Sequence, residues 1–212
     1  MKLTDLTVAE LLAAFQSSNP TPGGGSASAL AGAVGASLLT MVAALPKPRA
    51  ETEEDRERLA EAGRLCATLS KELTALVDRD SEAYEAVMAA YRLPKGSDTE
   101  KAARSQAIQE GLRQATAAPR DVMRACAAAI EQAVVVARHG NASASSDVQV
   151  AVELLRAGVV GARANVEINL ESLKDVGYVQ STREEAECFE QLVDREASRV
   201  RNLLGNSLRD EI

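Results

Sequence analysis

One acidic residue lies where a helical core is expected, which makes it a candidate for proton transfer. Two series with a seven-residue repeat run along residues 59–90: Leu59, Cys66, Leu73, Asp80 and Val87, and, three places later, Ala62, Leu69, Leu76, Ala83 and Ala90. This pattern is typical of a helix that packs against other helices along one seam. Burial raises the pKa of a carboxyl group toward the range of a general acid or base. Asp80 is therefore a candidate catalytic residue, and a structural Asp bonded to a neighbouring Arg or Asn is the alternative.

A second group of polar side chains follows small residues between positions 147 and 169. At helical spacing, one stripe contains Asp147, Ala151, Gly158, Gly161, Ala162, Asn165 and Asn169. Small residues permit the close approach of a helix or a ligand, and an Asn amide has both donors and an acceptor for the edge of a heterocycle. The stripe predicts either a ligand site that includes Asn165 and Asn169 or the packing of a second helix.

The other two faces of this segment differ in polarity. One face is apolar and consists of Val148, Val152, Leu155, Val159, Val166 and Leu170. The opposite face carries Glu153, Arg156, Arg163, Glu167, Glu171 and Lys174. An amphipathic helix turns its apolar face to the core, so we expect the charged face to lie in solvent.

A glycine-rich loop precedes an uncharged segment and consists of Gly23, Gly24, Gly25 and Ser26. Backbone N–H groups at the start of a helix can hold a carboxylate or a phosphate, so these residues are candidates for substrate binding. Their spacing matches neither the dinucleotide-binding pattern nor the P-loop, and a turn capped by Ser26 is the alternative.

Three cations lie beside prolines at expected helix ends: Lys47, Arg49 and Lys95. They are either fixed cations for an anionic substrate or isolated surface charges.

The elements that position these residues are all predicted to be helices. The periodicity predicts helices over residues 6–16, 26–46, 52–93, 97–138, 147–173 and 182–208. Thr7 with Glu10 and Thr182 with Glu185 match capping boxes, and Pro119 is expected to kink or split the fourth helix. No strand pattern occurs. We therefore expect a single all-α domain over residues 1–212, a bundle of about six long antiparallel helices.

Composition excludes several classes of protein. The net charge is −7 and only 2% of the residues are aromatic, so the chain lacks the basic surface and stacking rings of nucleic-acid binders. The segment from Ser26 to Pro46 is uncharged, but its Ala, Gly and Ser content favours a core helix over a membrane span. Three scattered cysteines and one His indicate neither disulfides nor a metal site. Together with a charged N-terminus unlike a signal peptide, these features predict a cytoplasmic protein.

Several segments, in this order, resemble the cyclodeaminase/cyclohydrolase family. They are PTPGGGSASALAGAVGA at residues 20–36, DSEAYEAVM at 80–88 followed by LPK at 93–95, GN at 140–141 with SD at 146–147, and NVEINL at 165–170. The family includes methenyltetrahydrofolate cyclohydrolases and the deaminase domain of formiminotransferase-cyclodeaminase. The resemblance covers about residues 4–200.

The resemblance implies an all-helical homodimer that binds a tetrahydrofolate derivative as substrate, with no metal and no bound redox cofactor. Members add water to a one-carbon bridge between two folate nitrogens, as in hydrolysis of methenyltetrahydrofolate to formyltetrahydrofolate, or close such a bridge with release of ammonia. Asp80 matches the acidic residue of the family and would act as the acid or base. The implied substrate-binding residues are Gly23, Gly24, Gly25, Ser26, Tyr84, Lys95, Asn141, Asp147, Asn165 and Asn169.

Two positions depart from the pattern of the family. Residues 44–49 are ALPKPR where members commonly have NLTxGK, so that the lysine of the family aligns nearest Arg49, with Lys47 as the alternative catalytic cation. Ser143 stands where a second Asn is usual. These departures leave a second hypothesis open, a divergent helical protein that binds folate or another ligand without catalysis.

Overall fold

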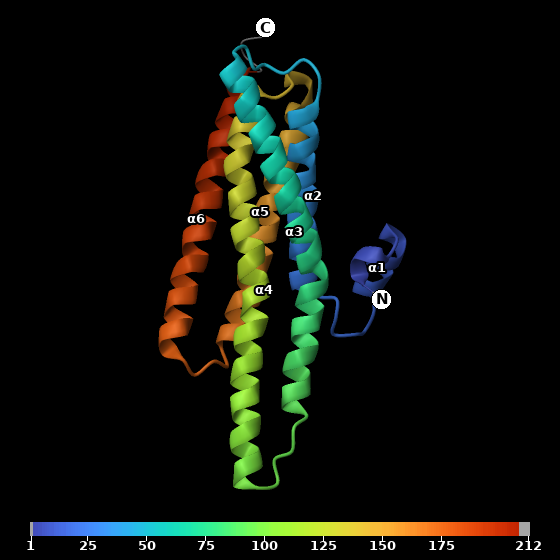
Figure 1. Cartoon of the computed structure of the whole chain (residues 1–212), viewed down its shortest axis with the longest axis vertical. Coiled ribbons are helices and arrows are strands. Elements are labelled where there is room, and N and C mark those ends of the chain that lie inside the picture. Colours follow the sequence, from blue (N-terminus) through green and yellow to red (C-terminus); the bar gives the residue numbers. More distant parts are fainter. Residues whose placement is uncertain (1, 208–212) are drawn as a thin grey trace.

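The computed structural model describes residues 2–207, which form an elongated bundle of helices (Figure 1). The α-helices are α1 (Val8–Phe15), α2 (Gly24–Ala44), α3 (Glu53–Tyr91), α4 (Asp98–His139), α5 (Ser145–Leu170) and α6 (Val176–Ser207). The described residues contain no strand. Five helices are long, whereas α1 is short and stands beside the bundle. The prediction of an all-α bundle is confirmed, with one short helix among the six.

Helix α2 packs against α3, α4 and α5 through small residues. A Cβ atom on Gly35 would lie 2.8 Å from the carbonyl oxygen of Ala151 on α5, and one on Gly32 would lie 2.5 Å from Sγ of Cys126 on α4. Glycine at these positions therefore allows the helices to approach closely. Among the described helices, α2 is the one that is long and apolar enough to cross a membrane. Its contacts with three neighbours are those of a core helix.

Helix α4 continues through Pro119 without a break, so the predicted split is wrong. Proline lacks the N–H group that would donate to the carbonyl oxygen of residue 115. The side-chain amide of Asn169 on α5 donates to that oxygen instead, at 3.1 Å. A side chain from a neighbouring helix thus satisfies the backbone group that Pro119 leaves open.

Helix α6 begins six residues earlier than predicted. Asp175 precedes the helix and accepts a hydrogen bond from the N–H of Tyr178 at 3.0 Å. Thr182 is buried inside the helix, and Glu185 pairs with Arg120 of α4, so the predicted capping box does not form. The predicted end at residue 208 lies outside the described residues.

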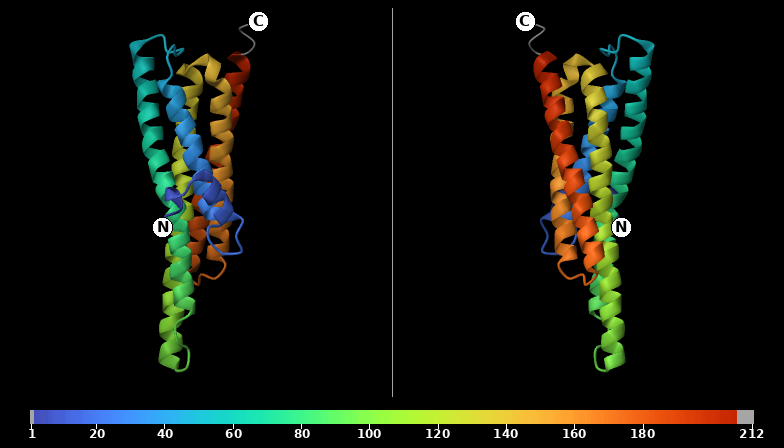
Figure 2. Two further views of the ribbon diagram at one scale, coloured as in Figure 1. Left: turned by 90° about the vertical axis from the view of Figure 1, so that its right-hand side faces the viewer. Right: turned by 90° about the vertical axis from the view of Figure 1, so that its left-hand side faces the viewer.

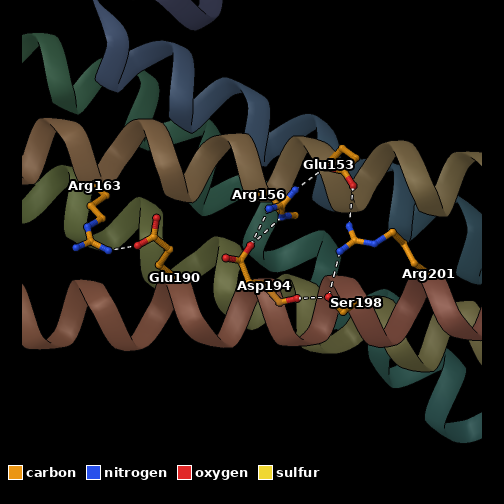
Figure 3. Close-up of polar contacts among 7 residues, drawn as sticks. All are labelled: Glu153, Arg156, Arg163, Glu190, Asp194, Ser198 and Arg201. Carbon is orange, nitrogen blue, oxygen red and sulfur yellow. Dashed lines mark hydrogen bonds and ion pairs between the residues drawn. The ribbon is translucent and has the colours of Figure 1, made fainter.

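Part of the charged face of α5 pairs with α6 (Figure 3), whereas Glu153 of this face and Glu171 and Lys174 just beyond the helix are exposed. Arg156 pairs with Asp194 at 2.8 Å, Arg163 pairs with Glu190, and Arg201 pairs with Glu153 at 3.2 Å. The prediction of a solvent-facing side is therefore only partly right, because α6 is itself rich in charge and pairs with Arg156 and Arg163. The face of α5 that remains in solvent includes three apolar side chains, Val150, Val160 and Ile168.

Helices α3 and α4 extend together beyond the ends of the other helices (Figure 1). This two-helix arm has a small core of its own, which consists of Val87, Ala90, Ile108, Leu112 and Ala115. The predicted seam of α3 is confirmed, because its apolar members are buried up to Leu76 in the main core and again at Val87 and Ala90 in the arm, with Ala83 partly buried between them. Asp80 lies between these two cores.

Candidate active site

A cavity of about 390 Å³ lies at the N-terminal end of α2, between the base of the arm and the last turns of α5. It is lined by Pro20, Thr21, Gly23, Gly24, Asp80, Tyr84, Val87, Met88, Tyr91, Ala115, Asn165, Ile168 and Asn169. This volume is in the range of small-molecule sites, and the mostly apolar walls with a few converging polar groups are typical of them. The fold thus brings together candidate residues from three separate segments of the sequence.

The carboxylate of Asp80 lies on the first turn of α2. Its Oδ2 accepts a hydrogen bond from the N–H of Ser26 at 3.0 Å, and the hydroxyl of Ser26 lies 3.3 Å away. A Cβ atom on Gly25 would lie 2.1 Å from Oδ1, so only glycine leaves room for the carboxylate. The first turn of α2 contains no acid, and its N-cap, Gly23, provides no side-chain cap. The side chain of Asp80, which belongs to α3, therefore caps the N-terminus of α2.

This arrangement changes the role of Ser26 and Gly25. Both were predicted to contact substrate through the start of α2, yet both are buried and the carboxylate of Asp80 covers them. The hydroxyl of Ser26 also donates to the carbonyl oxygen of Val77 at 2.8 Å. These two residues support Asp80, whereas Gly23 and Gly24 face the cavity itself.

The environment of Asp80 favours a carboxyl group that exchanges protons. Burial raises the pKa of Asp80 above its ordinary value, and the two hydrogen bonds from Ser26 act in the opposite direction. The residues that line the cavity include no Lys and no Arg. A carboxyl group with a raised pKa and no cation in the cavity lining is suited to accept and return a proton.

Two asparagines of α5 supply further polar groups to the cavity. The amide nitrogen of Asn165 donates to the carbonyl oxygen of Gly161 on its own helix at 2.8 Å. A Cβ atom on Gly24 would lie 3.4 Å from that nitrogen, so glycine keeps the loop close to α5 without crowding it. Asn169 donates to Ala115, as described above, and this bond fixes its orientation at the cavity wall. The small residues that precede Asn165 on the same stripe pack against α2, since a Cβ atom on Gly161 would meet Oγ of Ser28 at 2.3 Å.

Four other candidate residues lie together at the opposite end of α2. The side chain of Asn141 donates to the carbonyl oxygen of Pro46 at 2.6 Å, and Nε of Arg49 donates to the carbonyl oxygen of Gly140 at 3.3 Å. These bonds join the loop that holds Lys47 to the turn that precedes Asp147. The 21 residues of α2 separate this loop from Gly24 by about 30 Å. Within one chain, the structure does not bring Lys47, Arg49, Asn141 or Asp147 to Asp80.

Lys95 lies in the exposed loop at the tip of the arm and is not part of the cavity lining. In contrast, the cavity includes Met88 and Tyr91, which the sequence analysis did not select. The spacing of Asp80, Tyr84, Met88 and Tyr91 puts all four on one face of α3, which is the signal that could have identified them.

Comparisons with known proteins, by family model, by sequence and by structure, all find relatives of one family. The family model described as formiminotransferase-cyclodeaminase matches residues 7–188. A methenyltetrahydrofolate cyclohydrolase from Methylorubrum extorquens is 44% identical over 138 residues, which are 64% of this chain and 65% of that protein. A formimidoyltransferase-cyclodeaminase from Sus scrofa is 39% identical over 103 residues, 49% of this chain and 19% of that protein. The matches thus span less than two thirds of these relatives.

A solved structure is similar over nearly the whole chain. The crystal structure of a formiminotetrahydrofolate cyclodeaminase from Thermotoga maritima superimposes with a TM-score of 0.84 at 27% sequence identity, and the match covers 96% of this chain and 98% of that one. The family model therefore matches most of the sequence, and the same helical bundle recurs in a solved relative. By these matches, the chain belongs to the formiminotransferase-cyclodeaminase family.

Proposed function

We propose that this protein is an enzyme of one-carbon folate metabolism that hydrolyses methenyltetrahydrofolate to formyltetrahydrofolate. The observation that carries the proposal is the carboxyl group of Asp80, held against the start of α2 in a cavity of small-molecule size. Family membership supports the substrate class, since the relatives are named as cyclohydrolase and cyclodeaminase.

The proposed reaction moves both protons of the attacking water. Water attacks the methenyl carbon between the two folate nitrogens, and Asp80 accepts the first proton, which leaves a neutral hydroxyl adduct. One carbon–nitrogen bond of this adduct then breaks, Asp80 returns its proton to the departing nitrogen, and the hydroxyl releases the second proton to solvent as the formyl C=O bond forms. The positive charge of the methenyl bridge is stabilised by the ionised carboxylate, which has no competing cation in the lining of the cavity.

The walls of the cavity suit a folate-like heterocycle. Tyr84, Met88 and Tyr91 form an apolar and partly aromatic wall on α3, and Ile168 lies on the opposite side. The side-chain oxygen of Asn165 has no donor among the described residues, so it is free to accept a hydrogen bond from the substrate. We propose that this amide and Asn169 hold the polar edge of the ring.

The first prediction tests Asp80 directly. Asp80→Asn keeps the shape of the side chain but removes its ability to accept a proton, so we expect kcat to fall at least about a hundredfold. The measurement is the loss of methenyltetrahydrofolate absorbance, compared with buffer alone. Glu85→Gln is the matched control, because Glu85 is an exposed acid on the same helix outside the cavity lining. An Asp80→Asn protein as active as the native one would refute the assignment.

A second candidate reaction is the cyclodeaminase step, in which formiminotetrahydrofolate closes its one-carbon bridge and releases ammonia. It is favoured by the fold similarity to the Thermotoga maritima cyclodeaminase over almost the full length of both chains. The same carboxyl group would protonate the departing nitrogen. Ammonia release from formiminotetrahydrofolate separates the two activities. A protein that binds reduced folates but accelerates neither reaction would instead be the non-catalytic binder.

The remaining features of the proposal concern the working form of the protein. We propose a cytoplasmic homodimer that acts on a free folate and has no nucleic-acid or membrane partner. We also propose that neither a metal nor a redox cofactor takes part, because water, one carboxyl group and amide hydrogen bonds supply the chemistry that the reaction requires.

A further inference from the structure

The carboxyl group of Asp80 is connected to two different cavities, to one directly and to the other through hydroxyl groups. Asp80 itself lines the candidate active-site cavity. A second cavity, of about 510 Å³, lies on the other side of the loop that precedes α2, and Ser81 lines it. Thr21 of this loop lines both cavities, so the loop forms the wall between them. The neighbours Asp80 and Ser81 thus face different openings of the molecule.

The second cavity lies between α3 and the N-terminal segment of the chain. The short 3₁₀ helix η1 (Leu3–Asp5) contacts α3, and in the left view of Figure 2 the N-terminus lies beside α3 while α1 stands in front of α2. Asp5, Asp78 and Glu82 line this cavity together with one cation, Lys2. The excess of negative charge favours a proton that arrives there from inside the protein.

Ser26 lies between the two cavities and is completely buried. Its Oγ has three oxygen neighbours, the carbonyl oxygen of Val77 at 2.8 Å, Oδ2 of Asp80 at 3.3 Å and Oγ of Ser81 at 3.3 Å. A hydroxyl group has one proton to donate and two lone pairs that accept. Because three partners surround it, the hydroxyl of Ser26 can change the one that receives its proton by rotation alone. A hydroxyl group that passes a proton onward needs this property.

We propose that Ser26 and Ser81 form a proton relay, which carries a proton from Asp80 to the second cavity while the substrate fills the first. The inference rests on the proposed function, because hydrolysis of the methenyl bridge releases a proton in each turnover. A bound substrate separates Asp80 from the water of its own cavity, whereas the chain of hydroxyl groups behind Asp80 stays connected to solvent. Both serines act through Asp80 and need not contact the substrate.

The relay leaves every group of the chain as it was. After Asp80 has returned the first proton to the departing nitrogen, it accepts the second one from the hydroxyl group of the adduct, as the formyl C=O bond forms. The carboxyl group then donates this proton to Oγ of Ser26, and Ser26 passes its own proton to Oγ of Ser81. Ser81 passes its own proton to water in the second cavity. Each oxygen gains one proton and loses one, and rotation of both hydroxyl groups restores the starting arrangement.

Stopped-flow measurement of a single turnover tests the relay. With the protein in excess over methenyltetrahydrofolate, loss of absorbance reports bond cleavage, and an indicator dye in weak buffer reports proton release. In Ser81→Ala we expect absorbance loss at the native rate but proton release slowed about threefold or more, until the product leaves the cavity. In the steady state, the same variant should have a lower kcat with an unchanged kcat/KM. A defect in folding or in substrate binding would instead slow both signals together.

Two further variants complete the experiment. Ser70→Ala is the matched control, because Ser70 also lies on α3 and bonds to a hydroxyl group of α2, that of Ser37 at 2.7 Å, away from the cavity. It should change neither signal. Ser81→Thr keeps a hydroxyl group and should restore the native timing of proton release. Simultaneous signals in Ser81→Ala, or equal slowing of both, would overturn the relay and leave the role of Asp80 intact. A native protein that causes no loss of absorbance would refute the proposed function, and the relay with it.

Discussion

At the scale of single residues, the chemistry of the site depends on how Ser26 holds Asp80. The hydroxyl of Ser26 has one proton, which it donates either to the carbonyl oxygen of Val77 at 2.8 Å or to Asp80 at 3.3 Å. When Asp80 is ionised, donation to the carboxylate stabilises the charge. When Asp80 is protonated, the hydroxyl can turn to Val77 and accept from the carboxyl group. Ser26 therefore supports both protonation states of Asp80.

This arrangement makes a prediction about pH. Ser26→Ala removes a hydrogen bond that lowers the pKa of Asp80, and the effect of burial, which raises that pKa, remains. Since the ionised form accepts the proton from water in the proposed reaction, the acidic limb of the kcat/KM profile should move to higher pH.

The pH profile should be measured with Ser37→Ala as the control, because Ser37 lies on the same helix but bonds to Ser70 away from the cavity. The carboxyl carbon of Asp80, followed by NMR during titration, gives the same shift without any need for activity. An unchanged or lower pKa in Ser26→Ala would contradict the argument.

At the scale of elements, Pro119 and Asn169 form a coupled pair across α4 and α5. The proline leaves the carbonyl oxygen of Ala115 without its usual donor, and Asn169 replaces that donor. Because Ala115 and Asn169 both line the cavity, the bond that completes α4 also fixes one wall of the site. Helix continuity and site geometry thus depend on the same hydrogen bond.

A double-mutant cycle tests this coupling. Asn169→Ala should destabilise the ligand-free protein by about 1–3 kcal/mol, because the carbonyl oxygen of Ala115 is left unsatisfied. In a Pro119→Ala background the backbone N–H of residue 119 satisfies that oxygen, so the same substitution should cost less. Urea unfolding of the four proteins measures the difference. Equal costs in both backgrounds would show that the two residues act independently.

At the scale of the whole molecule, the bundle leaves one long face apolar and places the candidate residues at its two ends. The charged face of α5 is neutralised by α6, and the small-residue stripe is covered by α2. The exposed residues of α5 include three large apolar side chains, Val150, Val160 and Ile168. A second copy of the chain on this face, as in the proposed homodimer, would bury it.

The proposed dimer makes a prediction for this face. Val160→Arg introduces a charge in the middle of the exposed face of α5, where the native side chain is 53% exposed. We expect light scattering to give half the native mass, with helix content by circular dichroism unchanged. The control is Glu184→Arg, an exposed position on α6 away from this face. A Val160→Arg protein that remains dimeric would exclude this face as the interface.

The sequence by itself determined the all-helical class, most of the helix bounds and the apolar side of α3 and α5. Seven-residue spacing identified the seam of α3, the capping pair of Thr7 and Glu10 marked the start of α1, and the anomalous acid in the seam selected Asp80. These features follow from local spacing along a helix. The start of α6 was misplaced because the sequence offered a capping box at Thr182, whereas the helix begins directly after Asp175.

Only the tertiary structure decided which helix lies against each face. Spacing shows that Arg156 and Arg163 share a side of α5, but not that α6 supplies Asp194 and Glu190 to meet them. Likewise, the sequence made Gly23–Ser26 a candidate for holding a substrate anion, and the fold placed the carboxylate of Asp80 there instead. Neighbours far apart in sequence are set by the packing of whole helices, which periodicity within one helix does not specify.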